Sequence, residues 1–66
     1  MNVIVNGETR EMPAETTLSA MIELLGLPDE RIAIELNKAV IRRSRWDEAV
    51  LSDGDAVEIV HFVGGG

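Results

Sequence analysis

Cysteine is absent from this sequence, and histidine and aromatic residues are scarce. The 66 residues include one His, one Trp, one Phe and no Tyr. The absence of Cys excludes disulfides, a reactive thiol and a Cys/His zinc cluster. The single histidine, His61, has no obvious partner for acid–base chemistry. No apolar run approaches the ~20 residues of a membrane-spanning helix, and we therefore expect no membrane association.

Positive charge is also scarce. Six Lys and Arg residues stand against twelve Asp and Glu residues, which gives a formal net charge of −6 and a pI of about 4.5. A nucleic-acid binder needs a basic stripe to neutralise phosphates, and this chain has none. Its one basic cluster, Arg42, Arg43 and Arg45, is typical of a solvated loop and strand edge. An acidic chain instead suits a protein partner with a basic surface.

The length of the chain and its first residues indicate how the chain is organised. A chain of 66 residues forms one small domain with a thin core and an unfolding free energy on the order of 3–5 kcal/mol. A hydrophobic content of 45% is sufficient for that core and argues against disorder. The sequence begins like a strand and lacks the pattern of a signal peptide. We therefore expect a cytoplasmic protein that is a monomer when free.

Hydrophobic periodicity predicts five short strands. Apolar and polar residues alternate in these segments, as they do in strands with one buried face. Asn6-Gly7 is a strong hairpin signal, because both central residues of a type I′ turn need a positive φ angle. Asp53-Gly54-Asp55 marks a later turn, and its carboxylates are typical turn residues rather than acid–base groups. The predicted strands are residues 1–6, 8–12, 32–37, 40–42 and 56–63.

One helix is predicted between the second and third strands. Thr16 or Thr17 can cap its start, and Gly26 can take the left-handed conformation after its end. Its apolar stripe, at positions i, i+3, i+4 and i+7, consists of Leu18, Met21, Ile22 and Leu25. Residues 43–51 are weakly patterned, with Trp46 and Leu51 as predicted anchors. The order β-β-α-β-β-β predicts an α+β fold, in which one helix covers one face of a mixed β-grasp sheet.

The face of the sheet without the helix is predicted to carry apolar side chains. Ile4 on the first strand, and Val60 and Phe62 on the last, would project there. In the β-grasp arrangement these two strands are neighbours, and the three side chains would form one apolar patch. We interpret the patch as a docking surface for a partner protein. The alternative is that Phe62 folds back over the edge of the core.

The sequence ends in Val63-Gly64-Gly65-Gly66, directly after the last predicted strand. Glycines carry no side chain, which predicts a flexible tail of residues 64–66 outside a domain of residues 1–63. Such a tail can enter a narrow channel and present the Gly66 carboxylate to an enzyme that activates it with ATP. The acyl adenylate can then react with an amine, a thiol or a persulfide. The chain would be a carrier and not an enzyme, with no bound metal or cofactor.

Four segments give the sequence a resemblance to a known family. Over its whole length the chain resembles the ThiS-type sulfur carrier proteins of thiamine biosynthesis, within the ubiquitin-like β-grasp group. The part from Asn37 to Trp46 is more distinctive than the glycines, and Arg43 stands where these proteins often have Pro. The segments are M-N-V-I-V-N-G, T-T-L-S-A-M-I-E-L-L-G, I-A-I-E-L-N-K-A-V-I-R-R-S-R-W and L-S-D-G-D-A-V-E-I-V-H-F-V-G-G-G.

The resemblance implies a role in sulfur transfer. An E1-like adenylating enzyme would use MgATP to adenylate the Gly66 carboxylate. Sulfur from a cysteine-desulfurase-type persulfide would then replace AMP and give a thiocarboxylate. Thiazole synthase would take this sulfur for the thiazole ring and regenerate the carrier. Gly65 and Gly66 match the terminal pair of the family, and Gly64 extends it.

Other functions stay open at this point. The small subunit of molybdopterin synthase and Urm-like carriers share the tail chemistry, although the former tend to be longer. A ubiquitin-like modifier is a further alternative, although a chain with one lysine, Lys38, is poorly equipped to form polymers on itself. A plain protein-interaction module with an incidental tail is the alternative from another class. An acidic nucleic-acid mimic would need an ordered carboxylate spacing that this sequence does not have.

Overall fold

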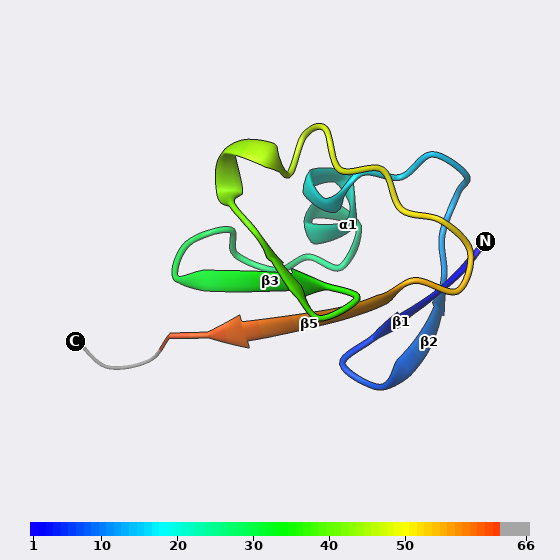
Figure 1. Cartoon of the computed structure of the whole chain (residues 1–66), viewed down its shortest axis with the longest axis horizontal. Coiled ribbons are helices and arrows are strands. Elements are labelled where there is room, and N and C mark those ends of the chain that lie inside the picture. The colour runs from blue at the N-terminus through cyan, green and yellow to red at the C-terminus, as the bar shows by residue number, and fades with distance from the viewer. Residues whose placement is uncertain (63–66) are drawn as a thin grey trace.

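The part of the chain that the structure describes folds into five strands and one α-helix in the predicted order (Figure 1). The computed structural model describes residues 1–62, so that Val63 and the three glycines of the predicted tail lie outside the described residues. A short 3-10 helix, η1, at Arg43–Arg45 adds to the predicted elements. The other elements are β1 Asn2–Val5, β2 Glu8–Glu11, α1 Leu18–Leu24, β3 Ile32–Leu36, β4 Ala39–Ile41 and β5 Ala56–His61.

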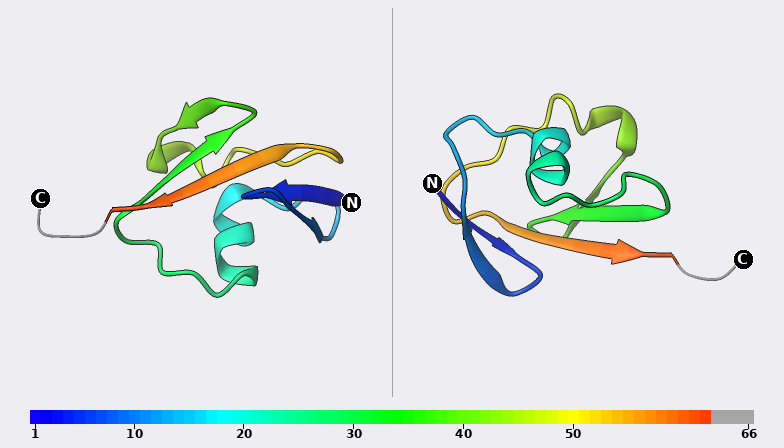
Figure 2. Two further views of the ribbon diagram at one scale, coloured as in Figure 1. Left: turned by 90° about the horizontal axis from the view of Figure 1, so that it is seen from below. Right: turned by 180° about the vertical axis from the view of Figure 1, so that it is seen from behind.

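The strands form one mixed sheet in the order β2-β1-β5-β3-β4. β1 and β5 run parallel, and the other neighbouring pairs are antiparallel. The helix α1 lies against one face of this sheet (Figure 2). Within residues 1–62, no helix covers the opposite face, which we call the open face. The arrangement confirms the predicted α+β fold with its mixed sheet.

The helix α1 is bounded by the predicted residues. Thr17 is its N-cap, and its Oγ1 accepts a hydrogen bond from the N–H of Ala20 at 3.1 Å. Gly26 follows the helix with a φ of +68°, and its N–H donates to the carbonyl of Glu23 at 3.0 Å. Such a left-handed residue satisfies the last carbonyls of a helix. The apolar stripe faces inward as expected, since Leu18, Met21 and Ile22 are buried and Leu25 packs against the core.

The core lies between α1 and the sheet. The alternation in β1 and β5 is confirmed, because Val3 and Val57 are buried while their neighbours in sequence are exposed. Both predicted anchors of the weakly patterned segment, Trp46 and Leu51, are also buried. The core residues are Val3, Val5, Met12, Leu18, Met21, Ile22, Ile32, Ile34, Trp46, Leu51, Val57 and Ile59.

Two tight turns join the strands of the two hairpins. Asn6 and Gly7 have φ angles of +49° and +84°, as the type I′ prediction requires. Asn37 and Lys38 have φ angles of +51° and +73° and form a second two-residue turn. Because that turn is so short, β4 begins at Ala39 and not at the predicted residue 40. The sequence predicts this link at Asn37-Lys38-Ala39, one residue longer than the observed turn, since Lys rarely takes the positive φ that the shorter turn needs.

Candidate functional site

The end of β5 is the place from which the predicted tail continues. β1 pairs with β5 only as far as Val57, whereas β3 pairs with it as far as His61 (Figure 1). Just beyond the strand, the N–H of Phe62 donates to the carbonyl of Arg31 at 2.8 Å. The predicted site residues Gly64, Gly65 and Gly66 lie outside the described residues, and their role stays a prediction.

The side chain of Asn6 contacts β5 just after β1 has ended. Its Oδ1 accepts from the N–H of Ile59 at 2.7 Å, and its Nδ2 donates to the carbonyl of Ile59 at 3.4 Å. The sequence predicts Asn6 at the end of the first strand and in the hairpin turn, but it does not predict this contact. No local signal marks it, because the two residues are 53 positions apart in the chain.

The structure separates the three residues of the predicted docking patch. Ile4, Val60 and Phe62 are 38%, 49% and 56% exposed, so that Phe62 does not fold back into the core. The register places Ile4 opposite Ala56, however, and Val60 follows four residues later, about 13 Å along the strand. Glu58 lies between them on the open face. The expectation of one continuous apolar patch is therefore corrected to two apolar areas on either side of an acidic residue.

The centre of the open face carries two facing carboxylates. Glu35 of β3 and Glu58 of β5 are direct partners in the antiparallel register. Both line a shallow hollow of about 440 Å³, together with Ile4 and with Lys38 from the β3–β4 turn. Like charges directly opposite each other on neighbouring strands repel. This surface therefore combines negative charge with exposed apolar area, which suits a partner that offers basic and apolar side chains.

Asp53 and Asp55 act as turn residues, as the sequence suggests. Asp53 Oδ1 accepts from the backbone N–H of Asn2 at 2.7 Å, and Asp55 Oδ2 accepts from the N–H of Ser52 at 2.8 Å. These bonds fix the loop that leads into β5. Within residues 1–62, no three His, Cys, Asp or Glu side chains converge as a metal site.

Asn37 holds the first residue of β5. Its Oδ1 accepts from the N–H of Ala56 at 2.9 Å, and its Nδ2 donates to Asp55 Oδ1 at 3.1 Å. Its backbone N–H also donates to the carbonyl of Ala56 at 2.7 Å. Asn37, the first residue of the distinctive part from Asn37 to Trp46, thus has a structural role at the start of β5.

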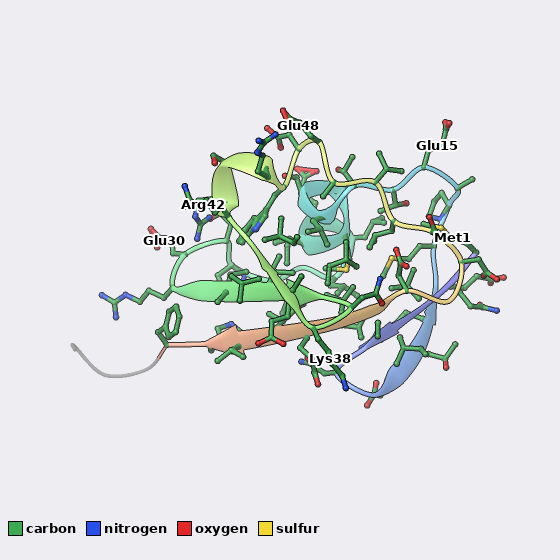
Figure 3. The ribbon with its side chains drawn as sticks, in the orientation of Figure 1. Met1, Glu15, Glu30, Lys38, Arg42 and Glu48 are labelled. Atoms are coloured by element: carbon green, nitrogen blue, oxygen red, sulfur yellow. The ribbon has the colours of Figure 1, made fainter. Side chains whose placement is uncertain are left out.

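Two of the three clustered arginines have structural partners beside η1. The guanidinium of Arg43 lies over the Trp46 ring, 4.5 Å from its centroid, and Arg45 pairs with Glu48 at 3.0 Å. Trp46 Nε1 in turn donates to the carbonyl of Ile41 at 2.9 Å. Arg42 and Glu48 lie near η1, away from Lys38 (Figure 3). Arg43 and Arg45 thus contact residues of this same corner, which agrees with the interpretation of the cluster as a loop and strand edge.

A groove on the helix side was not predicted from the sequence. It has a volume of about 650 Å³ and runs between α1 and the segment that follows η1. Ser19 Oγ of the helix donates to Asp47 Oδ1 across it at 2.5 Å. The hydrogen bond ties the helix to residues 46–47, and no strong local pattern in the sequence marks this contact.

Comparison with known proteins identifies the family. The ThiS family matches residues 3–66 of the chain. This chain belongs to the ThiS family. The crystal structure of a thiamine biosynthesis protein (ThiS) from Geobacter metallireducens superposes with a TM-score of 0.88 and 33% sequence identity, and the match covers 100% of both chains. These findings confirm the resemblance drawn from the sequence, and they confirm the β-grasp fold.

Two relatives of this ThiS family member differ in length. The "Sulfur carrier protein ThiS" of Bacillus subtilis (strain 168) is 36% identical over 63 residues, which cover 94% of this chain and 96% of that protein. The "Thiazole synthase" of Magnetococcus marinus is 42% identical over 66 residues, which are 100% of this chain and 20% of that protein. The chain thus spans about a fifth of the length of the thiazole synthases it matches.

Within residues 1–62, no helix has the length and hydrophobicity that crossing a membrane requires.

Proposed function

We propose that this member of the ThiS family is a sulfur carrier for thiamine biosynthesis. Residues 1–63 would serve as the body that docks, and residues 64–66 as the tail that enters a partner enzyme. The observation that carries the proposal is the family match, which extends to residue 66, together with a sulfur carrier relative of nearly equal length. The relatives named as ThiS favour thiazole formation over the pterin pathway of molybdopterin synthase.

The proposed chemistry takes place on the carboxylate of Gly66 and needs Gly66 to be the terminal residue. A carboxylate oxygen attacks the α-phosphorus of MgATP bound by an E1-like adenylating enzyme, and pyrophosphate leaves. A persulfide sulfur, supplied by a cysteine-desulfurase-type donor, then attacks the acyl carbon and AMP leaves. A thiol then attacks the donor-side sulfur of this acyl disulfide, forms a new disulfide with the donor, and releases the thiocarboxylate of Gly66.

The tail supplies access, and the partner enzymes supply catalysis. Gly64 and Gly65 have no Cβ, so that the chain can pass through a channel too narrow for other residues. A closed channel also excludes water, which would otherwise hydrolyse the acyl adenylate. The chain itself would be a cosubstrate that is regenerated, with ATP and Mg²⁺ held by the adenylating enzyme.

Thiazole synthase is the proposed acceptor of the sulfur. Support comes from the Magnetococcus protein of that name, which contains a region 42% identical to this chain. Fusion in one polypeptide raises the effective concentration of two domains that work together. The separate chain would instead dock through its open face, with Ile4 on one side of Glu58 and with Val60 and Phe62 on the other.

Intact-mass spectrometry tests the proposal directly. The chain is incubated with a ThiS adenylating enzyme, MgATP and a persulfide donor, and the expected product has one oxygen replaced by one sulfur. Omission of ATP and deletion of Gly66 are the controls, and neither should give the product. The proposal fails if the complete chain keeps its mass while the Bacillus subtilis protein is converted under the same conditions. That result would favour a plain interaction module.

The docking surface has its own test and matched control. Ile4→Glu and Phe62→Glu place a charge on the open face, and each should weaken binding to the adenylating enzyme at least tenfold, since a charge in an apolar contact is poorly solvated. Leu24→Glu changes a side chain that is 59% exposed on the helix side and should leave binding unchanged. Equal affinity of all three variants for the adenylating enzyme would show that the open face is not the docking surface.

A further inference from the structure

One edge of β5 is held by a side chain where a strand is missing. β1 faces that edge only at Ile4↔Ala56 and Val5↔Val57, because the Asn6-Gly7 turn then leads the chain away into β2. Beyond Val57, no strand within residues 1–62 pairs with this edge. Backbone groups on a strand edge need hydrogen-bond partners. The N–H and C=O of Ile59 are the next two groups on it, and Asn6 binds both.

The side chain of Asn6 prolongs the parallel ladder by one step. Its backbone N–H donates to the carbonyl of Val57 at 2.8 Å, in the manner of a normal strand residue. Its carboxamide then repeats this pattern on Ile59, with an acceptor distance of 2.7 Å and a donor distance of 3.4 Å. A carboxamide carries a donor and an acceptor side by side, as a peptide group does. No hydroxyl or carboxylate reproduces that pair.

We propose that Asn6 is a positioning residue for acyl transfer, which fixes the direction in which β5 delivers the chain towards Gly66. This inference rests on the proposed carrier function. The β3 edge holds the strand end through the bond from Phe62 to Arg31. A strand bonded on one edge can pivot about that edge, whereas bonds on both edges at Ile59 prevent the pivot. A fixed exit direction lowers the entropy that is lost when the tail enters a channel.

The chain contains a matched control at the other end of the same strand. Asn37 also stands first in a two-residue turn, with a φ of +51° against +49° for Asn6. Its Oδ1 accepts from the N–H of Ala56, the first residue of β5. Replacement of either Asn by Gly keeps the positive φ and removes the side-chain bonds. Only the replacement of Asn6 acts on the end of β5 that leads to Gly66.

The test compares steady-state adenylation of the wild-type chain, Asn6→Gly and Asn37→Gly by a ThiS adenylating enzyme at saturating MgATP. Asn6→Gly should raise KM for the carrier by about fivefold, the factor expected when about one residue of backbone must be ordered on binding. Its kcat should not change, because the ordering is complete once the carrier is bound. Asn37→Gly should keep KM within about twofold of wild type. Equal KM values for the two variants would overturn the proposal.

If the Gly variants fold poorly, a second pair of variants and a second measurement can still test the proposal. Asn6→Asp and Asn37→Asp keep the acceptor and lose the donor, and only Asn6→Asp should raise KM, to a value between wild type and Asn6→Gly. Amide hydrogen exchange in the free protein should speed up at Ile59 only for Asn6→Gly and at Ala56 only for Asn37→Gly, whereas the Asp variants keep the acceptor of each N–H and should keep its protection. Faster exchange without a change in KM refutes the positioning role alone. If the wild-type chain is not adenylated, that result refutes both the carrier function and the positioning role.

Discussion

Trp46 belongs to the core and also contacts Ile41 of β4 and Arg43 of η1. Trp46→Phe should therefore lower the unfolding free energy by about 2–3 kcal/mol. The residue is 4% exposed, and its Nε1 donates to the carbonyl of Ile41 at 2.9 Å. Phe keeps a ring but loses this donor, at a cost of about 1 kcal/mol. The smaller ring leaves a void that costs about 1–2 kcal/mol. The contact with the Arg43 guanidinium weakens by a few tenths of a kcal/mol.

Urea unfolding followed by far-UV circular dichroism measures the loss, since the variant has no tryptophan fluorescence. The expected loss is about half of the total stability of a domain of this size, so that the urea midpoint should fall by about half at constant m-value. Leu24→Ala is the control, because Leu24 is 59% exposed and its change should stay below about 0.5 kcal/mol. A loss for Trp46→Phe as small as that of the control would refute the assigned role of the indole.

Three further substitutions test other parts of the structure by the same urea unfolding assay. Lys38→Gly should raise the unfolding free energy by about 0.5–1 kcal/mol, because Lys38 has a φ of +73° that Gly adopts freely; a lower urea midpoint would contradict this. Glu35→Gln should raise the unfolding free energy by about 0.5 kcal/mol, because it removes the repulsion with Glu58. This gain should shrink in high salt, and a gain that does not shrink would exclude an electrostatic cause. Met21→Ala should lower the unfolding free energy by about 2–5 kcal/mol, because Met21 is fully buried, and a wild-type midpoint would contradict that position.

The elements of the fold could be predicted because their signals are local. The turn at Asn6-Gly7 follows from the φ angles that these two residues tolerate. The helix follows from the apolar stripe that begins at Leu18 and from the cap at Thr17. In each case the residues that decide the conformation are neighbours in the chain. The glycines of the candidate tail were recognised in the same way, from composition and position in the sequence.

The docking surface could be predicted only in part. Alternation along each strand correctly placed Ile4, Val60 and Phe62 among the exposed residues. It did not show that Glu58 lies between Ile4 and Val60, because alternation gives the face of a residue and not its neighbour across the sheet. The link at Asn37-Lys38-Ala39 was predicted, but its two-residue length was not, since the positive φ of Lys38 is maintained by the surrounding strands.

Which segments become strands or helix, and which side chains turn inward, follows from periodicity and turn chemistry that act within a few residues. The register of β1 on β5, the facing of Glu35 and Glu58, and the bond from Asn6 to Ile59 across 53 positions depend instead on the packing of the whole domain. Register is set by how both strands pack on α1 at once, and that packing depends on side chains from the whole chain.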